Sequence, residues 1–255
     1  LKLGNCYFNG AGVEQNYTKA IDLFEKSSKL LNSDAMTKLG NCYYNGKGVE
    51  QNYQKAREYY EKAAELGNSN AMNSLGVCFE NENCVDYNGQ VSYSYSKTTT
   101  SNYGSSFFSY TTTTTSADDY KYYKAAEYYE KAAKLGNIDA LINLGKCYLY
   151  GRGVEKNRVK AGECYQKANL DKSDDPDILE LIGDYYLSKM KFNKAIACFE
   201  KATKLGKDLE KKIFMATASK SSIRFMRAAV GLWYLILQNT SEISIKINIH
   251  SIHKK

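Results

Sequence analysis

Small and apolar residues recur along the chain at the spacing of helical faces. Ala35 and Tyr43 each lie four residues from Leu39, so these side chains share one face of a helix. A second helix of the same kind carries Ala56, Tyr60 and Ala63. Between the two faces, residues 45–53 read NGKGVEQNY, and its asparagine and glycines are typical of a turn. The pattern therefore predicts a hairpin of two helices.

The hairpin pattern is repeated, which indicates an array of similar units. Residues 9–17 read NGAGVEQNY and differ from residues 45–53 at one position, 36 residues further on. Five units carry a glycine in the first helix: Gly4, Gly40, Gly76, Gly145 and Gly183. An aromatic residue follows each glycine by three: Tyr7, Tyr43, Phe79, Tyr148 and Tyr186. A Lys-Ala pair opens each second helix, at Lys19, Lys55, Lys124, Lys160 and Lys194. A second aromatic follows at Phe24, Tyr60, Tyr129, Tyr165 and Phe199.

Glycine has a physical purpose in this pattern. Inside a helix it costs about 1 kcal/mol relative to alanine, so we expect Gly40 and its counterparts to permit a close helix crossing. Gly67 and Gly136 fit the left-handed position that ends a second helix, and Ser69 or Asp139 would cap the next one. A lone hairpin cannot bury its apolar stripe, so the units are predicted to stack as a solenoid.

These residues resemble the Sel-one-like repeat (SLR) family, relatives of the tetratricopeptide repeats, over residues 1–208. In the fifth unit, Gly183 and Ala195 are 12 residues apart, which is the tetratricopeptide spacing, whereas Gly40 and Ala56 are 16 apart. The resemblance implies an all-α fold, a right-handed α-α superhelix of about five helix-turn-helix repeats. It also implies that the chain binds a peptide or protein partner as a non-catalytic adaptor.

Two segments lack the repeat pattern. Residues 87–118 form a Ser/Thr/Tyr-rich insert within the third repeat, which cannot bury enough apolar surface to offset the entropy of ordering. It is expected to project as a disordered loop that is dispensable for folding; phosphorylation or partner docking is the functional alternative. Residues 209–255 are predicted to form capping helices and an irregular basic tail. The tail contains an apolar run, 228–237, that is too short to span a bilayer but could touch a membrane surface.

The distribution of charge and the positions of the cysteines restrict the range of possible functions. The net charge is +7, but residues 207–255 carry nine basic residues against three acids, so the repeats are nearly neutral and nucleic-acid binding is not indicated. Of seven cysteines, four share one repeat position and two another, which favours packed, reduced thiols. A disulfide between Cys147 and Cys164 is the alternative.

No catalytic constellation is present. The only two histidines, His250 and His253, lie in the tail, and the sequence lacks H-E-x-x-H, G-x-S-x-G and P-loop motifs. We therefore expect no enzymatic activity, no cofactor and no metal site. One alternative is that the chain is the repeat region of a larger enzyme or regulator, either one linked to a kinase or one similar to the hydrolase-like bacterial relatives. Another is that it is a component of endoplasmic-reticulum-associated degradation.

A partner is expected to bind in the concave groove that tetratricopeptide-like stacking forms from the first helices. The residue after each glycine is predicted to face this groove: Asn5, Asn41, Val77, Lys146 and Asp184. Asparagine amides suit a peptide backbone, and Lys146 suits an acidic group or a carboxyl terminus. Tyr44 and Tyr150, one helical turn further on, would supply apolar anchors. The alternative is that these are ordinary solvated side chains.

The compartment depends on what precedes the sequence. Because Leu1 falls inside the first helix of a unit, we expect the native chain to start before it. A cytoplasmic location is expected from the cysteines, and the lumen of the endoplasmic reticulum is the alternative if a signal peptide lies upstream. Neither the partner nor the oligomeric state follows from the sequence.

Overall fold

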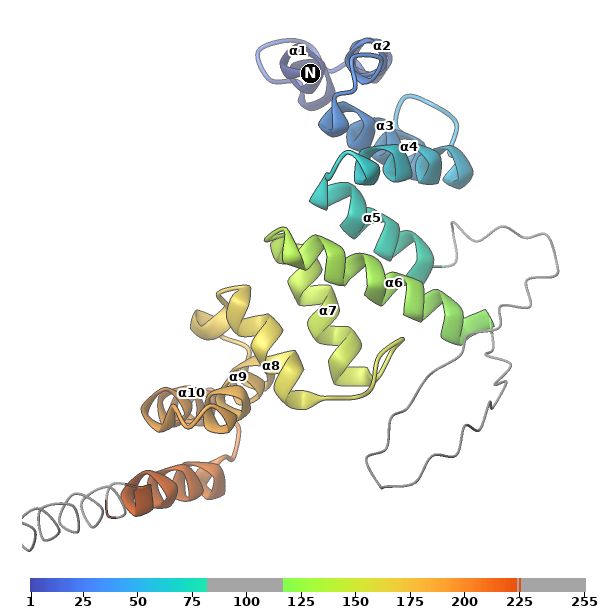
Figure 1. Ribbon diagram of the computed structural model, residues 1–255. Helices are drawn as coiled ribbons and strands as arrows, with labels where there is room; N and C mark the ends of the chain where they lie inside the picture. The colour runs from blue at the N-terminus through green and yellow to red at the C-terminus, as the bar shows by residue number, and fades with distance from the viewer. Residues whose placement is uncertain (82–116, 224, 226–255) are drawn as a thin grey trace, which may run out of the picture. The chain divides into compact units, whose positions relative to one another are not determined.

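The computed structural model describes residues 1–81, 117–223 and 225, and this part of the chain is helical throughout, without strands (Figure 1). The chain divides into two compact units, Leu1–Leu170 and Asp171–Lys255. Most of the insert and most of the basic tail lie outside the described residues. The expected range of the insert, 87–118, differs slightly from the structure, because a helix already begins at Ala117.

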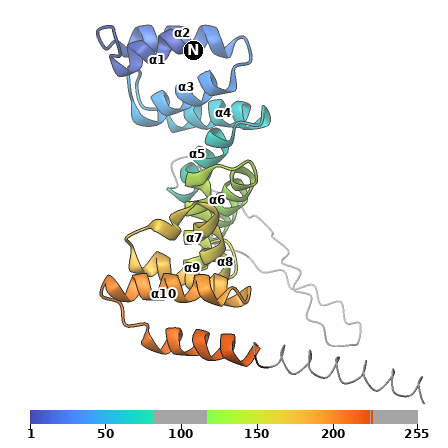
Figure 2. The same cartoon turned by 90° about the vertical axis from the view of Figure 1, so that its left-hand side faces the viewer.

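The first unit consists of four hairpins. Their helices are α1 (Lys2–Asn9), α2 (Tyr17–Ser28), α3 (Ser33–Asn45), α4 (Tyr53–Glu65), α5 (Ser69–Glu80), α6 (Ala117–Lys134), α7 (Ile138–Tyr150) and α8 (Arg158–Lys167). Each helix packs on the next one along the chain, as Figure 2 shows. This arrangement confirms the predicted stack of helix-turn-helix repeats.

The second unit contains the fifth hairpin and a further helical segment. The hairpin is α9 (Pro176–Ser188) with α10 (Phe192–Lys204), and a short 3-10 turn, η1 (Leu170–Lys172), precedes it. Residues 210–223 are also helical. Leu209 and Ala216 from this part of the chain are buried, so the segment contributes to the core of the unit.

The repeated glycine brings the two helices of each hairpin into close contact. A methyl group added at Gly40 would lie 2.4 Å from Cε1 of Tyr60, a ring that is only 2% exposed. The corresponding distances at Gly4, Gly76, Gly145 and Gly183 are 2.6, 2.4, 2.6 and 2.3 Å. Since real Cβ contacts are longer than this, only glycine fits, and the sequence-based expectation of a close crossing is confirmed.

Asparagine caps the helices, and this corrects one prediction. Gly67 and Gly136 do adopt the left-handed conformation, with φ of 82° and 80°. The following residue, however, is the cap: the Asn68 side chain accepts a hydrogen bond from the backbone N–H of Ala71. Neither Ser69 nor Asp139 is the cap, because Ser69 is already the first residue of α5 and Asp139 the second residue of α7. Asn16, Asn32, Asn52, Asn137 and Asn157 cap α2, α3, α4, α7 and α8 in the same way.

The lysine of the Lys-Ala pair packs on an aromatic ring in four of the five repeats. The ammonium of Lys55 lies 5.4 Å from the ring centroid of Tyr43, which is the geometry of a cation–π contact. The same contact joins Lys19 to Tyr7, Lys160 to Tyr148 and Lys194 to Tyr186, at 5.2–5.4 Å. The third repeat differs, because Lys124 instead forms an ion pair with Glu127 at 2.9 Å.

The cysteines lie at packing positions. Of the six described, all but Cys6 are buried. Burial raises the pKa of Cys42, Cys164 and Cys198 to about 11 and that of Cys147 to about 12. Thiolates are therefore disfavoured at neutral pH, and such thiols are poor nucleophiles. Cys147 and Cys164 belong to one core cluster, so the expectation of reduced thiols and its disulfide alternative both remain predictions.

A stabilising substitution follows from a departure from the repeat. Leu31 adopts φ of 59° at the position where later repeats place Gly67 and Gly136, and it is 70% exposed. A leucine in the left-handed conformation destabilises the folded state by about 1–2 kcal/mol. Glycine removes this strain, but its greater conformational freedom also stabilises the unfolded chain and cancels part of the gain. We expect Leu31→Gly to raise the free energy of unfolding in urea by about 0.5–1 kcal/mol. Leu30→Gly is the control, since exposed Leu30 has negative φ; an equal gain there would refute the explanation.

Candidate partner-binding surface

The first helices of the repeats carry a stripe of mostly polar residues. Its residues are exposed or half-buried at three- and four-residue intervals. On α3 they are Asp34, Lys38, Asn41 and Asn45. On α5 they are Asn70, Ser74, Val77 and Asn81, and on α7 they are Asn143, Lys146 and Tyr150. We call these eleven residues the first-helix stripe.

Hydrogen bonds between asparagines hold successive first helices in register. Nδ2 of Asn143 on α7 donates to Oδ1 of Asn73 on α5 at 3.2 Å. Nδ2 of the cap Asn137 donates to Oδ1 of Asn70 at 2.8 Å. One repeat earlier, Nδ2 of Asn68 donates to Oδ1 of Asp34 at 2.8 Å. A row of amide and carboxylate groups therefore connects α3, α5 and α7, and sequence reasoning missed it. The cap position, asparagine at 32, 68 and 137, was the available signal.

Asn41 is partly engaged within its own hairpin. Its Oδ1 accepts a hydrogen bond from the Tyr60 hydroxyl at 2.6 Å. We expected the amide to offer a donor and an acceptor together, but the structure uses the carbonyl oxygen, so the amide group contributes chiefly its two N–H donors. A substitution at Asn41 would also remove the partner of the buried Tyr60, so Asn41 is unsuited to a clean test of binding.

The two predicted aromatic anchors differ in exposure. Tyr44 packs edge-on against Tyr53, with ring centroids 5.3 Å apart, and its hydroxyl accepts a hydrogen bond from Nδ2 of Asn81 at 3.2 Å. Tyr150 is 62% exposed, and the guanidinium of Arg152 lies 5.4 Å from its ring centroid. Tyr150 is therefore the better anchor for a partner, because most of its surface is accessible.

An ion pair near Tyr150 joins the third and fourth repeats. Nη1 of Arg152 lies 3.1 Å from Oε1 of Glu80, and the hydroxyl of Tyr129 donates to Oε2 of the same carboxylate at 2.9 Å. Burial and the neighbouring Glu80 charge raise the pKa of Tyr129 well above its usual range. The phenol therefore stays protonated and fixes Glu80 in place. Sequence reasoning did not identify this contact, since its members lie up to 72 residues apart.

The other predicted site residues in the first unit are separate from one another. Asn5 is half-buried on α1, and Val77 is half-buried on α5. Lys146 is exposed on α7. No recorded contact joins these three side chains directly. They occupy equivalent positions on the first helices of three repeats, so a ligand that contacts several of them must be extended along the stack.

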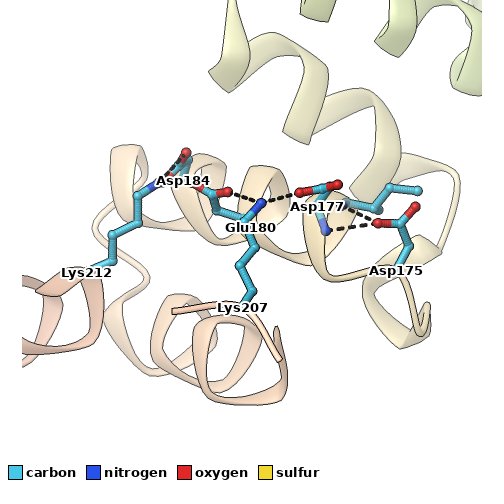
Figure 3. Close-up of polar contacts among 7 residues, drawn as sticks. Asp175, Asp177, Glu180, Asp184, Lys207 and Lys212 are labelled. Carbon is cyan, nitrogen blue, oxygen red and sulfur yellow. Dashed lines mark hydrogen bonds and ion pairs between the residues drawn. The ribbon is translucent and has the colours of Figure 1, made fainter. Parts of the chain in front are cut away.

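Asp184, the predicted site residue of the fifth repeat, is paired within its own unit (Figure 3). Nζ of Lys212 lies 2.6 Å from Oδ1 of Asp184 and 2.6 Å from Oε1 of Glu180. Lys207 pairs with the other oxygen of Glu180 and with Asp177. Burial alone would raise the pKa of Glu180, but the hydrogen bonds and charges of the two lysines outweigh it and lower that pKa to about 2.

The described residues contain no group of three or more histidine, cysteine or acidic side chains arranged to hold a metal ion. Among the helices that the structure describes, none is both long enough and apolar enough to cross a membrane.

Stacked helical hairpins with a repeated glycine–aromatic crossing define a solenoid repeat protein, and comparison with known families gives the particular type. The Sel1 repeat model matches residues 1–30, 33–68, 119–137, 138–170 and 181–207, which is more than half of the chain. The chain therefore belongs to the Sel1 repeat family, as its sequence resemblance indicated. Proteins of this family generally act as protein-interaction scaffolds, and the fold is typically non-catalytic.

Comparison with solved structures gives two matches. A Sel1 repeat protein from Oxalobacter formigenes matches with a TM-score of 0.52 and 21% identity, over 83% of this chain and 74% of that one. A protective antigen of uropathogenic Escherichia coli with an SLR fold matches with a TM-score of 0.38 and 23% identity, over 89% of this chain and 48% of that one. No match was found among curated proteins. At such identities the Oxalobacter structure supports the fold alone.

Proposed function

We propose that this chain is a non-catalytic adaptor that binds an extended peptide segment of a partner protein along the first-helix stripe. The observation that carries the proposal is the row of asparagine contacts between α3, α5 and α7. These contacts hold polar groups of successive first helices beside one another, and Asp34, Asn70 and Asn143 of the stripe take part in them. An extended peptide presents backbone N–H and C=O groups at regular intervals, so a rigid row of amides is suited to it.

Lys146 and Tyr150 form the part of the stripe best suited to a side chain or carboxylate of the ligand. Both are exposed, and they lie four residues apart on α7. A lysine ammonium can pair with a carboxylate, and a tyrosine ring offers apolar area with a polar tip. Arg152, beside Tyr150, is already ion-paired with Glu80, so Lys146 is the cation that a ligand carboxylate would meet at this end of α7. We therefore propose that the ligand carries an acidic group next to an apolar residue.

The test is a double substitution, Lys146→Ala with Tyr150→Ala. After a partner has been isolated with the intact chain, its affinity for the variant is measured by titration calorimetry. We expect binding to weaken at least about tenfold, because one charged contact and one aromatic anchor are lost. The melting temperature should stay nearly unchanged, because both side chains are exposed.

A matched control uses a second helix. Lys26→Ala with Leu30→Ala removes a lysine and an exposed apolar residue with the same four-residue spacing, at α2 and just beyond it. This variant should bind the partner as the unchanged chain does. Equal weakening by both double variants, or none by either, would place the binding surface elsewhere.

A further inference from the structure

Two of the repeats contain a stack of two aromatic rings, and the fourth repeat carries one ring of that stack. The ring of Tyr43 on α3 lies nearly parallel to that of Tyr59 on α4, with centroids 5.7 Å apart and 9° between the planes. Phe79 on α5 and Tyr128 on α6 form the same stack at 5.6 Å and 13°. Tyr148 on α7 is the corresponding first ring of the fourth repeat, because it follows its glycine by three residues as Tyr43 and Phe79 do.

A cysteine stands where the second ring of this stack is expected. Tyr59 and Tyr128 each lie four residues after the lysine of the Lys-Ala pair, and Cys164 lies four residues after Lys160. The thiol is much smaller than a phenol ring, and the repeat does not close over the space. A cavity of about 260 Å³ remains beside Cys164 and Tyr148.

The second repeat shows what the missing ring does. The corresponding depression there is lined by Met36 and Tyr59, and Tyr43 is not among its lining residues. In the fourth repeat the cavity extends to Tyr148, the counterpart of Tyr43. The ring of Tyr59 therefore covers Tyr43, whereas the corresponding face at Tyr148 is open to the cavity.

The walls and the size of the cavity suit one aromatic ring. Leu141 and Leu144 of α7 line it together with Cys164 and Tyr148, so its inner wall is largely apolar. An apolar cavity of about 150 Å³ admits benzene, and pockets for drug-sized molecules hold about 300–1,000 Å³. At about 260 Å³ this cavity has room for a single side chain.

The charges at the mouth of the cavity favour an uncharged occupant. Two ion pairs lie there and their charges cancel: Lys134 with Glu130 at 3.0 Å, and Lys167 with Glu163 at 2.8 Å. The ammonium of Lys160, which also lines the cavity, lies 5.2 Å from the ring centroid of Tyr148. A carboxylate or an ammonium on the ligand would therefore gain little here.

We infer that this cavity, lined by Leu141, Leu144, Tyr148 and Cys164, receives one aromatic side chain of a partner protein, with tyrosine as the preferred residue. We call it the ring slot. The chain itself indicates the occupant, because a tyrosine fills the same place in the second and third repeats. Stacking on Tyr148 adds to the apolar contact. The ring slot includes no residue of the first-helix stripe, so it is a second interaction site, independent of the first.

A lysine is in place to cover the inserted ring. The counterparts of Lys167 in the second and third repeats, Lys62 and Lys131, lie 5.8 and 5.2 Å from the ring centroids of Tyr59 and Tyr128. Such a cation–π contact favours an aromatic ring over an aliphatic side chain of similar size.

The test is an NMR titration of the full chain, with isotope-labelled leucine methyl groups, using the capped peptide acetyl-Gly-Tyr-Gly-amide. An inserted ring should shift the methyl resonances of Leu141 and Leu144 in a saturable way. The same peptide with leucine in place of tyrosine should bind about two- to tenfold more weakly, because it cannot stack on Tyr148.

Cys164→Tyr restores the second ring from within the chain and should close the ring slot. Peptide binding should weaken at least about tenfold, and the melting temperature should rise by about 2–4 °C because the new ring stacks on Tyr148. Cys164→Ala is the matched control: it leaves the slot open and should bind the peptide as the unchanged chain does. Tyr148→Leu removes the stacking surface by a separate route and should weaken binding about two- to tenfold.

The inference is overturned if the leucine methyl resonances do not move, if the two peptides bind equally, or if Cys164→Tyr binds the tyrosine peptide undiminished. It is also overturned if Cys164→Tyr melts below the unchanged chain, because the slot would then not accommodate a ring. A dimer that Cys164→Tyr converts to a monomer in sedimentation velocity would likewise overturn it, since a second copy would fill the slot. Lys146→Ala with Tyr150→Ala should leave binding of this peptide unchanged, which separates the ring slot from the first-helix stripe.

Discussion

Replacing Gly40 with alanine should lower the free energy of unfolding by about 2 kcal/mol, although alanine is the better helix former by about 1 kcal/mol. The added methyl group would lie 2.4, 2.5 and 3.0 Å from three atoms of the Tyr60 ring. That ring is 2% exposed, and its hydroxyl is hydrogen-bonded to Asn41, so it cannot move aside without loss. The helices must separate instead, which disturbs the hairpin core. Urea unfolding followed by circular dichroism measures the effect.

A second substitution separates steric conflict from backbone strain. Tyr60→Leu should lower the free energy of unfolding by at least about 1 kcal/mol less in the Gly40→Ala variant than in the unchanged chain, because the smaller side chain relieves the clash. Tyr60→Phe should give no such relief, since the ring remains. Gly12→Ala is the backbone control: Gly12 has φ of 74° and open space around it, so its cost of about 1 kcal/mol is conformational. Additive effects of Gly40→Ala and Tyr60→Leu would contradict the packing explanation.

The glycine–aromatic crossing could be predicted from sequence because repetition makes it visible. A single glycine in a helix has many explanations, but Gly4, Gly40 and Gly145 each recur with an aromatic residue 20 positions further on, in the second helix. The physical cost of a helical glycine then requires a compensating contact. The lysine of the Lys-Ala pair was equally regular, yet its cation–π contact was not predicted, because a lysine on a helix is usually explained by solvent exposure.

The cap residues and the pairing of Asp184 were harder to predict. Asparagine, serine and aspartate all cap helices well, so sequence could not choose between Asn68 and Ser69, which are adjacent. Asp184 matched the position of Asn41 in the repeat, and position alone suggested an available side chain. Its partner Lys212 lies in a segment with no repeat pattern, 28 residues further along the chain. Only the three-dimensional arrangement brings these charges together.

Lowering the pH should reduce the stability of the second unit, because it protonates the carboxylate of Glu180. Its pKa is lowered from 4.5 to about 2, so the folded state favours the ionised carboxylate more than the unfolded chain does. The stabilisation is therefore complete above pH 4.5 and is lost as the pH falls from 4.5 to about 2. A shift of this size corresponds to at most about 3 kcal/mol, and screening around the partly exposed lysines reduces it to about 2 kcal/mol. Urea unfolding at successive pH values over this range measures the loss.

Glu180→Gln identifies the source of this acid sensitivity. At pH 7 the free energy of unfolding of the variant should be about 2 kcal/mol lower than that of the unchanged chain, because Lys207 and Lys212 keep their charges without the carboxylate between them. On further acidification the variant should lose less of this free energy than the unchanged chain does. Asp177→Asn is the matched control. Asp177 pairs with the same Lys207, but its side chain is 78% exposed against 11% for Glu180. An exposed pair contributes little, so Asp177→Asn should cost under about 1 kcal/mol and leave the acid transition intact. If Glu180→Gln instead unfolds in acid as the unchanged chain does, the bridge from α9 to the segment at 210–223 does not stabilise the unit.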